Sequence, residues 1–512
     1  MIVLVHENNR PLQVLDASLN ELKFSVEPSI METMFALAKT FPDDIIMWCY
    51  KTYVKYINTS EISNIFYHKQ IMASFSVCKT SYIPKAIGFI DQSVFVNVKY
   101  DVRYPTWLMS SDIGGVSAEF LNATNGIKSC QNFDYFLNSL AKLAMPKGLF
   151  CYSEPKFLKE LPGHGIQTKK ASTGELFQFA KQHYKWVWTY MLLLCQIIYH
   201  KRITFFSFVR SLFYKKRSVT FQSLEIQSSK VVVNKKEIDV VIPTIGRKQY
   251  LYDVLKDLAV QTLLPKNVIV VEQNPSEKSV SELNFLTEDD WPFKIKHVFT
   301  HQTGACNARN IALDLVESEW VFLNDDDNRF EVHLLKSVFE KIEQYGVDVL
   351  TTEYLQKGET LPRQYNYTHQ TGIFGSGCSV VKTESLKDIR FNMALEFGYG
   401  EDTDFGRQLR NSGNDVIFFP DLKIVHLKAP MGGFRTKFFH PWEKEKEQPK
   451  PSPTVMYVRK KFYTDEQFLG FKCISFFRYY SQQKNKNPFS YFSKFIRDWK
   501  LSIFWADKLE QH

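Results

Sequence analysis

Between residues 238 and 324, short apolar runs alternate with longer amphipathic segments, and this alternation strongly constrains the fold. The apolar runs predict strands at 238–242, 267–271, 296–299 and 320–323, and the intervening segments predict helices that include 251–259 and 303–316. Strands that alternate with helices form a parallel sheet with right-handed crossovers. The carboxyl ends of these strands therefore meet at one edge of the sheet, where open α/β sheets bind their ligands.

Polar side chains follow three of these strands at that edge. Thr244 follows the first strand, Glu272 follows the second, and the last is followed by Asp325, Asp326 and Asp327. Three adjacent carboxylates repel one another, and a hard divalent cation such as Mg²⁺ or Mn²⁺ would compensate their charge. A solvated acidic turn that caps the next helix is the alternative, because most isolated Asp runs have that role.

Further candidate groups lie downstream of the acidic triplet. The glycine-rich segment 372–378 allows backbone to approach a ligand closely. On the helix expected after Gly400, Asp402 shares a face with Phe405 and Leu409, so it is either a helix cap or a group held close to substrate. His426 lies on a short strand; such a histidine is usually structural, but beside a carboxylate-bound cation it would suit Mn²⁺ better than Mg²⁺.

Residues 1–165 predict an α/β domain of their own. Strands are expected at 2–5, 44–50 and 93–98, helices at 30–40 and 133–144, and a turn at 112–116. The segment has no acidic triplet after a strand and no glycine-rich phosphate loop, so we assign it no catalytic role. One interpretation is that it is a degenerate copy of the domain that follows.

Residues 166–235 predict a helical, basic-amphipathic linker. Residues 186–199 are strongly apolar, but a helix that crosses a membrane needs about twenty residues. Residues 201–217 interleave apolar with basic side chains: Phe205, Phe206, Phe208, Val209, Leu212 and Phe213 with Lys201, Arg202, Arg210, Lys215, Lys216 and Arg217. Two interpretations remain open, namely packing between domains or docking on an anionic membrane surface.

Residues 441–512 predict a Pro-rich loop followed by a helical extension. The loop covers 442–454, and the extension mixes basic residues with many aromatics, which would pack on the N-terminal domain or meet the membrane. Interleaved basic and aromatic residues also occur in proteins that bind single-stranded nucleic acid. No RNA-binding motif accompanies them, so nucleic acid is not an expected partner.

Charge and cysteine usage narrow the setting. A net charge of +9 over 512 residues favours anionic partners without choosing among them. The eight cysteines are scattered, with no CxxC pair, which predicts reduced thiols in a cytoplasmic setting and neither a zinc site nor a disulfide framework. The first ten residues resemble a strand more than a secretion signal. The prediction is a cytoplasmic protein, either free or peripheral on the inner face of the membrane.

Five motifs occur in order: VIPTIGR at 241–247, VIVVE at 268–272, ARN at 308–310, FLNDDD at 322–327 and GED at 400–402. With these motifs, residues 238–435 resemble a family 2 glycosyltransferase. The resemblance implies a GT-A-type fold, a Rossmann-like mixed sheet flanked by helices, with the catalytic domain at 236–440. The chain departs from the family pattern in two ways: Glu272 and Gln273 stand where an Asp-containing pair is common, and Ile245 stands where an aromatic ring is common.

The resemblance also implies an activity. It is inverting, metal-dependent transfer of a hexosyl or N-acetylhexosaminyl group from a nucleotide sugar, with UDP favoured, to a hydroxyl of a glycan or lipid-linked saccharide. Bacterial cell-surface polysaccharide synthesis is the expected process.

The same resemblance assigns roles to individual residues. Asp402 would be the catalytic base, and Gly377 and Glu401 would contact the acceptor or the sugar. The metal ligands, for Mn²⁺ or Mg²⁺, would be Asp325, Asp327 and His426. The donor would contact Pro243, Thr244, Arg247, Glu272, Arg309, Asp325, Asp326 and Arg435, the last of these as a clamp on the diphosphate.

Two other functions stay open at this point. A sugar-phosphate nucleotidyltransferase also combines an α/β sheet with acidic metal ligands, but it would carry a glycine-rich loop with a basic residue after the first strand, of which 243–247 is a poor version. The other alternative is a catalytically inactive scaffold with a transferase fold.

Overall fold

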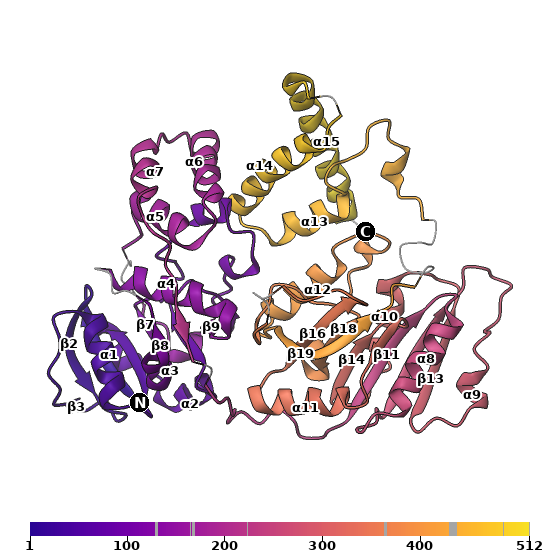
Figure 1. The fold of residues 1–512 in the computed structure, drawn as a ribbon, viewed down its shortest axis with the longest axis horizontal. Coiled ribbons are helices and arrows are strands. Elements are labelled where there is room, and N and C mark those ends of the chain that lie inside the picture. The colour runs from indigo at the N-terminus through magenta and orange to yellow at the C-terminus, as the bar shows by residue number, and fades with distance from the viewer. Residues whose placement is uncertain are drawn as a thin grey trace. The chain divides into compact units, whose positions relative to one another are not determined.

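The chain folds into two compact units, each with its own sheet (Figure 1). The structure is a computed structural model, and it describes residues 1–127, 132–163, 165, 169–222, 224–362, 366–429, 438–484 and 486–510. The first unit consists of Met1–Lys230 and Tyr463–Cys473, and the second consists of Val231–Phe462 and Ile474–His512. The segment 463–473 therefore joins a unit from which it is separated by more than two hundred residues of sequence.

The second unit contains the mixed sheet that the strand–helix alternation predicts. The sheet has the order β13-β12-β11-β14-β18-β16-β19-β15, and β17 pairs with β19. The pairs β11–β12, β11–β14 and β12–β13 are parallel, whereas β18 runs antiparallel to both β14 and β16. The strands are β11 (Ile238–Thr244), β12 (Asn267–Gln273), β13 (Lys294–Thr300), β14 (Trp320–Asn324), β15 (Asn328–Phe330), β16 (Val349–Gln356), β17 (His369–Gln370), β18 (Cys378–Lys382) and β19 (Ile417–His426).

Helices pack on this sheet through the apolar faces that the sequence predicts. The helices within this part of the chain are α8 (Lys248–Ala259), α9 (Phe285–Glu288), α10 (Ala305–Leu313), α11 (Leu334–Tyr345) and α12 (Glu401–Asn411). After them come α13 (Pro453–Phe462), α14 (Asp465–Ser481), which is divided between the two units, and α15 (Pro488–Leu509). Phe405 and Leu409 of α12 share a core cluster with Val241, Ile269 and Leu323 of the strands. This packing fixes the first turn of α12, and with it Asp402, beside the sheet.

The first unit holds a second mixed sheet, of order β3-β2-β1-β4-β7-β5-β9-β6. Its strands are β1 (Ile2–Glu7), β2 (Arg10–Leu15), β3 (Glu21–Leu22), β4 (Ile45–Tyr50), β5 (Ile71–Phe75), β6 (Tyr104–Pro105), β7 (Ile113–Ser117) and β9 (Phe150–Ser153), with β8 (Thr124–Asn125) and β10 (Thr220–Phe221) paired separately. Its helices are α1 (Ile30–Thr40), α2 (Ile62–Ile65), α3 (Ala118–Ala123), α4 (Phe133–Ala144), α5 (Thr173–His183), α6 (Val187–His200) and α7 (Phe205–Ser211).

The two sheets share a pattern of pairings. In the first unit β1 pairs parallel with β4, β4 and β5 each pair antiparallel with β7, and β5 pairs parallel with β9. In the second unit β11, β14, β16, β18 and β19 follow in the same chain order and repeat each of these pairings. The neighbours of the first strand differ, because β1 forms a hairpin with β2 whereas β11 pairs parallel with β12.

Two local predictions for the first unit are wrong. Residues 94–96 form a 3-10 turn in place of the expected strand at 93–98, and the expected turn at 112–116 falls largely within β7. Gly114 and Gly115 suggested a turn, yet here they permit close packing. A Cβ on Gly114 would lie 2.4 Å from the Trp48 ring and 2.6 Å from the Ala73 carbonyl oxygen.

The segment 166–235, expected as a separate linker, belongs to the first unit over most of its length. Phe177 and Phe179 of α5, Leu192 and Cys195 of α6, and Phe208 of α7 are buried in that unit's hydrophobic core. Amphipathic spacing predicted the helices but did not indicate which unit's hydrophobic core they pack on. Among the described residues, none of the helices combines the length and the apolar character needed to cross a membrane.

Candidate active site

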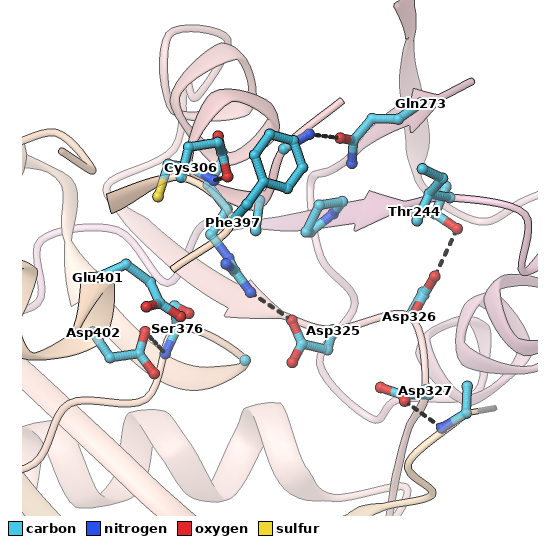
Figure 2. Close-up of a pocket in the computed structure, with 18 of the residues that line it drawn as sticks. Thr244, Gln273, Cys306, Asp325, Asp326, Asp327, Ser376, Phe397, Glu401 and Asp402 are labelled. Carbon is cyan, nitrogen blue, oxygen red and sulfur yellow. Dashed lines mark hydrogen bonds and ion pairs between the residues drawn. The ribbon is translucent and has the colours of Figure 1, made fainter. Parts of the chain in front are cut away.

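A cavity of about 400 Å³ opens in the second unit, where β11 and β14 end (Figure 2). Side chains from far apart in the sequence line it. Thr244 ends β11, Arg309 lies on α10, and Asp402 lies in the first turn of α12. The acidic triplet lies at the end of β14, between these elements, so the predicted convergence of strand ends is present.

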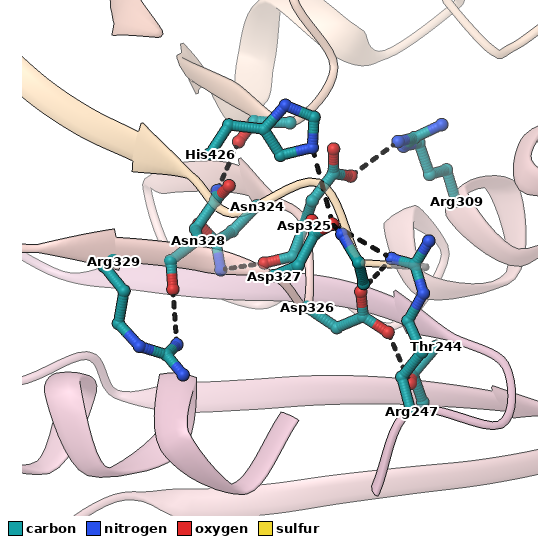
Figure 3. A network of polar contacts seen from close by, with 12 residues as sticks. Thr244, Arg247, Arg309, Asn324, Asp325, Asp326, Asp327, Asn328, Arg329 and His426 are labelled. Atoms are coloured by element: carbon teal, nitrogen blue, oxygen red, sulfur yellow. Dashed lines mark hydrogen bonds and ion pairs between the residues drawn. The ribbon is translucent and has the colours of Figure 1, made fainter. Parts of the chain in front are cut away.

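The three adjacent aspartates have three different sets of partners (Figure 3). Asp326 accepts hydrogen bonds from Thr244 Oγ1 at 2.7 Å and from Arg247 Nη1 at 2.6 Å. The backbone N–H of Ala429 donates to Asp327 Oδ2 at 2.8 Å, and His426 Nε2 lies 3.4 Å from the same oxygen.

Asp325 is turned toward the opposite side of the cavity. Its Oδ1 accepts from Arg309 Nη2 at 2.8 Å, and its Oδ2 accepts from the Tyr354 hydroxyl at 3.2 Å. Arg309 is itself buried and lies over the Phe391 ring at 5.5 Å, so its position is well determined. The Arg309 guanidinium compensates the charge of the Asp325 carboxylate.

These contacts shift the pKa values of the triplet in different directions. Burial raises the pKa of Asp326 to about 6, against the opposing effect of Arg247. Burial also opposes ionisation of Asp327, yet hydrogen bonds from His426 and the Ala429 N–H hold its pKa below the usual value. The hydrogen bond with Asp327 in turn raises the pKa of His426. The contact between Asp327 and His426 thus favours the ionised form of each group.

Gly377 permits the close approach of the loop before β18 to Asp325. A Cβ at this position would lie 2.2 Å from Asp325 Oδ2. The Gly377 carbonyl accepts a hydrogen bond from Asn328 Nδ2 at 2.7 Å, which ties the loop to the residue that follows the triplet. Any side chain at position 377 would displace the Asp325 carboxylate.

Asp402 and Glu401 face the cavity from the first turn of α12 (Figure 2). The backbone N–H of Ser376 donates to Asp402 Oδ1 at 3.2 Å. Burial raises the pKa of Asp402, and burial together with the neighbouring Asp402 raises the pKa of Glu401 to about 7. A carboxylate with a raised pKa is a better proton acceptor than an exposed one.

The cavity brings together most of the residues that the sequence singled out. Its lining includes Pro243, Thr244, Arg247, Arg309, Asp325, Asp326, Asp327, Gly377, Glu401, Asp402 and His426. Glu272 is not part of the lining; it accepts hydrogen bonds from Ser281 Oγ at 2.5 Å and pairs with His297 Nε2 at 2.9 Å. Arg435 lies outside the described residues.

Several lining residues were not predicted. Gln273 lines the cavity and accepts a hydrogen bond from the Gly304 N–H at 2.6 Å. Glu396 accepts from the N–H groups of Cys306 and Asn307 at the start of α10, and Phe397 beside it has a positive φ of 57°. The sequence drew attention to the pair 272–273 but not to Glu396, whose partners lie ninety residues earlier in the chain.

In the described part of the chain, no three His, Cys, Asp or Glu side chains are gathered around a common point as a preformed metal site. Asp327 and His426 already lie together, but Asp325 contacts Arg309 and Tyr354 instead. A cation bound by all three would require the Asp325 side chain to turn. The carboxylate and imidazole donors themselves suit Mn²⁺ or Mg²⁺.

Part of this chain is similar in sequence to known proteins. Residues 239–396 match the family described as Glycosyl transferase family 2. Glycosyltransferase GlyG of Streptococcus pneumoniae is 20% identical over 137 residues, which cover 27% of this chain and 42% of that protein. The succinoglycan biosynthesis protein ExoM of Rhizobium meliloti is 25% identical over 210 residues, which cover 38% of this chain and 67% of that protein. The match to GlyG thus spans less than half of that relative.

Solved structures of S. aureus TarS are also similar to this chain. Residues 1–349 of TarS in complex with UDP-GlcNAc match with 18% identity and a TM-score of 0.35, covering 51% of this chain and 81% of that one. A longer TarS structure matches with 19% identity and a TM-score of 0.36, covering 52% and 54%.

Proposed function

We propose that the family 2 glycosyltransferase domain at residues 239–396, completed by α12 and β19, transfers a sugar from a nucleotide-sugar donor to an acceptor hydroxyl with inversion. The observation that carries this proposal is the arrangement in one cavity of the acidic triplet, the buried cation of Arg309 and the half-buried carboxylate of Asp402. A cation-binding edge and a base that share one cavity are what a displacement at a sugar carbon requires.

Asp402 has the properties of the base in this reaction. As the acceptor oxygen attacks the anomeric carbon, its proton passes to Asp402 and the bond from that carbon to the diphosphate oxygen breaks. Burial raises the pKa of Asp402, which improves it as a proton acceptor. Attack from the face opposite the leaving group inverts the configuration.

The acidic triplet and the two arginines would receive the diphosphate. Asp325, Asp327 and His426 would hold Mn²⁺ or Mg²⁺, and the imidazole favours Mn²⁺. When bound, the cation would neutralise charge on the leaving diphosphate. Arg309 lies beside Asp325 and Arg247 beside Asp326, so both cations border the same space. In this proposal Asp326 is a positioning residue, since it fixes Thr244 and Arg247.

The donor class and the setting are finer parts of the proposal. We favour a UDP-sugar carrying a hexosyl or N-acetylhexosaminyl group, and a glycan or lipid-linked saccharide as acceptor. The name of ExoM, a succinoglycan biosynthesis protein, supports polysaccharide synthesis. The reaction would take place in the cytoplasm. Gln273, which lines the cavity, replaces Glu272 as the candidate contact for the nucleotide.

Ligand-dependent thermal stabilisation tests the proposal. The full chain would be melted with UDP, GDP or CDP, each with and without Mn²⁺. At a hundredfold excess over the dissociation constant, a bound nucleotide adds about 2.7 kcal/mol to the free energy of unfolding. We expect UDP to stabilise the protein only in the presence of Mn²⁺.

Two variants make the result specific. Asp327→Ala should abolish the Mn²⁺-dependent stabilisation. Asp421→Ala should retain it, because Asp421 also lies at this sheet but pairs with Lys341 at 2.7 Å, away from the cavity. Absence of stabilisation by every nucleotide under every metal condition would contradict the proposed function.

A further inference from the structure

Residues 176–224, which include α6 and α7, carry a distinctive combination of charge and apolar exposure. The segment contains eight Lys and Arg residues and no Asp or Glu. Many of its large apolar side chains are exposed even though α5, α6 and α7 are folded and packed on the core of the first unit. Figure 1 shows α6 and α7 side by side within this unit.

The exposed apolar side chains form what we call the α6–α7 face. Its most exposed members are Ile203, Phe206 and Phe213, at 86%, 90% and 84%. The other members are Trp186, Val187, Tyr190, Ile197, Ile198, Phe205 and Leu212. Isolated apolar side chains are common on protein surfaces, but a group of this size indicates an interaction site.

Ring contacts link the aromatic side chains at the start of α6 with those of α7. Trp186 contacts Tyr190 with ring centroids 5.5 Å apart, and Tyr190 contacts Phe208 at 4.9 Å. Phe208, which is buried, contacts the exposed Phe205 at 6.3 Å. The aromatic side chains of α6 therefore continue into those of α7 without a break.

Basic side chains are interspersed among these apolar ones along the sequence. Lys201, Arg202, Arg210, Lys215 and Lys216 are exposed, and none of them pairs with a carboxylate among the residues that the structure describes. A protein partner that covered the face would have to supply several acidic groups around an apolar centre. A bilayer of anionic lipid presents phosphate at its surface and acyl chains directly below, in the same relative arrangement.

We propose that the α6–α7 face docks on the surface of an anionic membrane, with Ile203, Phe206 and Phe213 inserted among the acyl chains and the basic side chains at the level of the headgroups. Trp186 and Tyr190 would lie at the interface, where amphipathic aromatic rings are favoured. Docking of this kind does not depend on the transferase reaction. It would bring the enzyme to lipid-linked acceptors.

Vesicle sedimentation tests the docking. The full chain would be mixed with two kinds of vesicle. One consists of phosphatidylcholine alone, and the other contains about 30% of the anionic lipid phosphatidylglycerol. We expect binding to the anionic vesicles, weakened by salt, and at least about tenfold weaker binding to the neutral ones, because each cation near an anionic surface contributes roughly fivefold.

Matched variants distinguish binding through the α6–α7 face from nonspecific hydrophobic adsorption to vesicles. Phe206→Ser with Phe213→Ser should reduce binding at least about tenfold while leaving the melting temperature unchanged, because both side chains are already exposed. Phe489→Ser removes an equally exposed ring, at 84%, from α15 in the second unit and should leave binding intact.

Three outcomes would overturn the docking proposal. One is absence of binding to anionic vesicles, and another is equal binding by the double variant and the wild type. The third is a dimer in solution that the double variant dissociates, because the face would then be covered by a second copy of the chain.

A second inference rests on the pairings that the two sheets share. The last β4–β7 pair is Cys49 with Ile113, and the last β14–β18 pair is Asn324 with Cys378. By this register Tyr50 corresponds to Asp325, and Ser111 corresponds to Ser376. Each antiparallel strand has a helix later in the chain whose second residue is an aspartate: Asp134 in α4, which comes after α3 and β8, and Asp402 in α12, which comes directly after two 3-10 turns.

The two carboxylates also share a hydrogen bond. The Ser111 N–H donates to Asp134 Oδ1 at 3.1 Å, as the Ser376 N–H donates to Asp402 Oδ1 at 3.2 Å. Here the likeness ends. Where the second unit has Asp325, Asp326 and Asp327, the first has Tyr50, Lys51 and Thr52, and Phe133 stands in place of Glu401.

The space beside Asp134 is filled by aromatic rings. Phe133 is fully buried and contacts the rings of His6 at 5.8 Å and Trp48 at 5.8 Å. His6 Nε2 is hydrogen-bonded to the Ser111 carbonyl at 2.7 Å. Asp134 therefore keeps the place of the base, but among the described residues no cluster of metal-binding side chains accompanies it, and aromatic rings pack beside it.

We infer that the first unit is a second copy of the transferase fold that has lost its donor site, so the chain binds one nucleotide sugar. This inference rests on the proposed function of the second unit. Calorimetric titration of the full chain with UDP and Mn²⁺ should give one site, and Asp327→Ala should remove it. Asp134→Asn should leave both binding and transfer unchanged.

The outcomes distinguish this inference from the proposed function. Two nucleotides per chain, a site that survives Asp327→Ala, or loss of transfer in a normally folded Asp134→Asn variant would overturn it. If no nucleotide binds at all, the proposed function of the second unit is contradicted, but the inference that the first unit lacks a donor site is not.

Discussion

At the scale of single residues, the strand position of a side chain decides whether it reaches the cavity. Asp325, Asp326 and Asp327 could be predicted from the sequence because a buried strand runs directly into them. Glu272 and Gln273 are adjacent on β12, and side chains alternate between the faces of a strand, so only one of them can face the cavity. Sequence spacing did not show which of the two faces the cavity. Glu396 could not be identified from the sequence, because its partners on α10 are distant in the chain.

Replacement of Asp402 by Asn tests the base. The amide keeps the shape and can still accept the Ser376 N–H bond, but it cannot take a proton. We expect kcat to fall about 10²- to 10⁴-fold, the usual contribution of a general base, with donor affinity unchanged. Initial-rate kinetics with UDP-dependent melting as the folding control would measure this. A kcat within about threefold of wild type would exclude Asp402 as the base.

The pH dependence of transfer is a second test of Asp402 as the base. Because the base must be ionised and burial raises its pKa, activity should rise with pH from the acidic side. Burial and Asp402 also raise the pKa of the neighbouring Glu401 to about 7. Glu401→Gln should therefore shift the acidic limb of the kcat profile while retaining activity. An unchanged limb would show that Glu401 does not influence the base.

Gly377→Ala tests the close approach to Asp325. The added methyl group would lie 2.2 Å from Asp325 Oδ2, so the carboxylate must move. We expect a destabilisation of about 1–3 kcal/mol, typical of overpacking, together with loss of Mn²⁺-dependent nucleotide binding. Gly163→Ala is a suitable control, because nothing lies within 4 Å of a Cβ at that position. Normal metal-dependent binding by Gly377→Ala would contradict the role of Asp325.

At the scale of elements, α12 could be predicted from its amphipathic spacing, but its contact with α13 could not. Asp404 is fully buried in the first turns of α12, and Lys461 Nζ of α13 donates to it at 2.8 Å. Gln408, one turn along α12, donates to the same carboxylate at 2.5 Å. The helix that carries Asp402 is thus anchored by a residue more than fifty positions away, which no local pattern indicates.

Two adjacent lysines of α13 allow a matched comparison of this anchor. Lys461→Met leaves the buried Asp404 carboxylate with less compensation and should cost roughly 2 kcal/mol, below the range for a fully buried pair because Lys461 is 37% exposed. Lys460 pairs with the exposed Asp507, so Lys460→Met should cost less than about 1 kcal/mol. Urea denaturation would measure both. Equal effects would argue against an anchoring role for the Lys461–Asp404 pair.

At the scale of the whole molecule, the sheet of the second unit was predictable because strands and helices alternate without interruption. The first unit was predictable only in part, since β7 contains two glycines that resemble a turn. The assignment of residues 463–473 to the first unit could not be predicted from the sequence. The segment 463–473 completes the first unit from the far end of the chain, and only tertiary packing reveals that.

Buried carboxylates in the first unit predict a pH-dependent stability. Burial raises the pKa of Asp134 to about 6, so the folded state binds its proton more tightly than the unfolded chain does. Stability should therefore fall as pH rises from about 4 to 6, and then level off for this group. Asp134→Asn removes the penalty of ionisation, and its advantage over wild type should grow with pH to at most about 3 kcal/mol.

Urea denaturation of the two proteins at a series of pH values would check this. The difference between the midpoints should be small near pH 4 and largest above pH 6, a range fixed by the ordinary and the raised pKa of Asp134. A difference that does not vary with pH would show that Asp134 ionises normally in the folded protein.

The helix α14 has a practical consequence for anyone who divides this chain. Gln467 Nε2 donates to the carbonyl oxygens of Asp91 and Ser93, and Gly470 packs so closely on Phe89 that a Cβ would lie 2.3 Å from its carbonyl oxygen. An expression fragment that stops at residue 230 would leave those carbonyls unpaired and the Phe89 backbone uncovered. The same helix continues as Ile474–Ser481 of the other unit. Truncation at residue 230 is therefore expected to destabilise the first unit, because residues 463–473 would be missing from it.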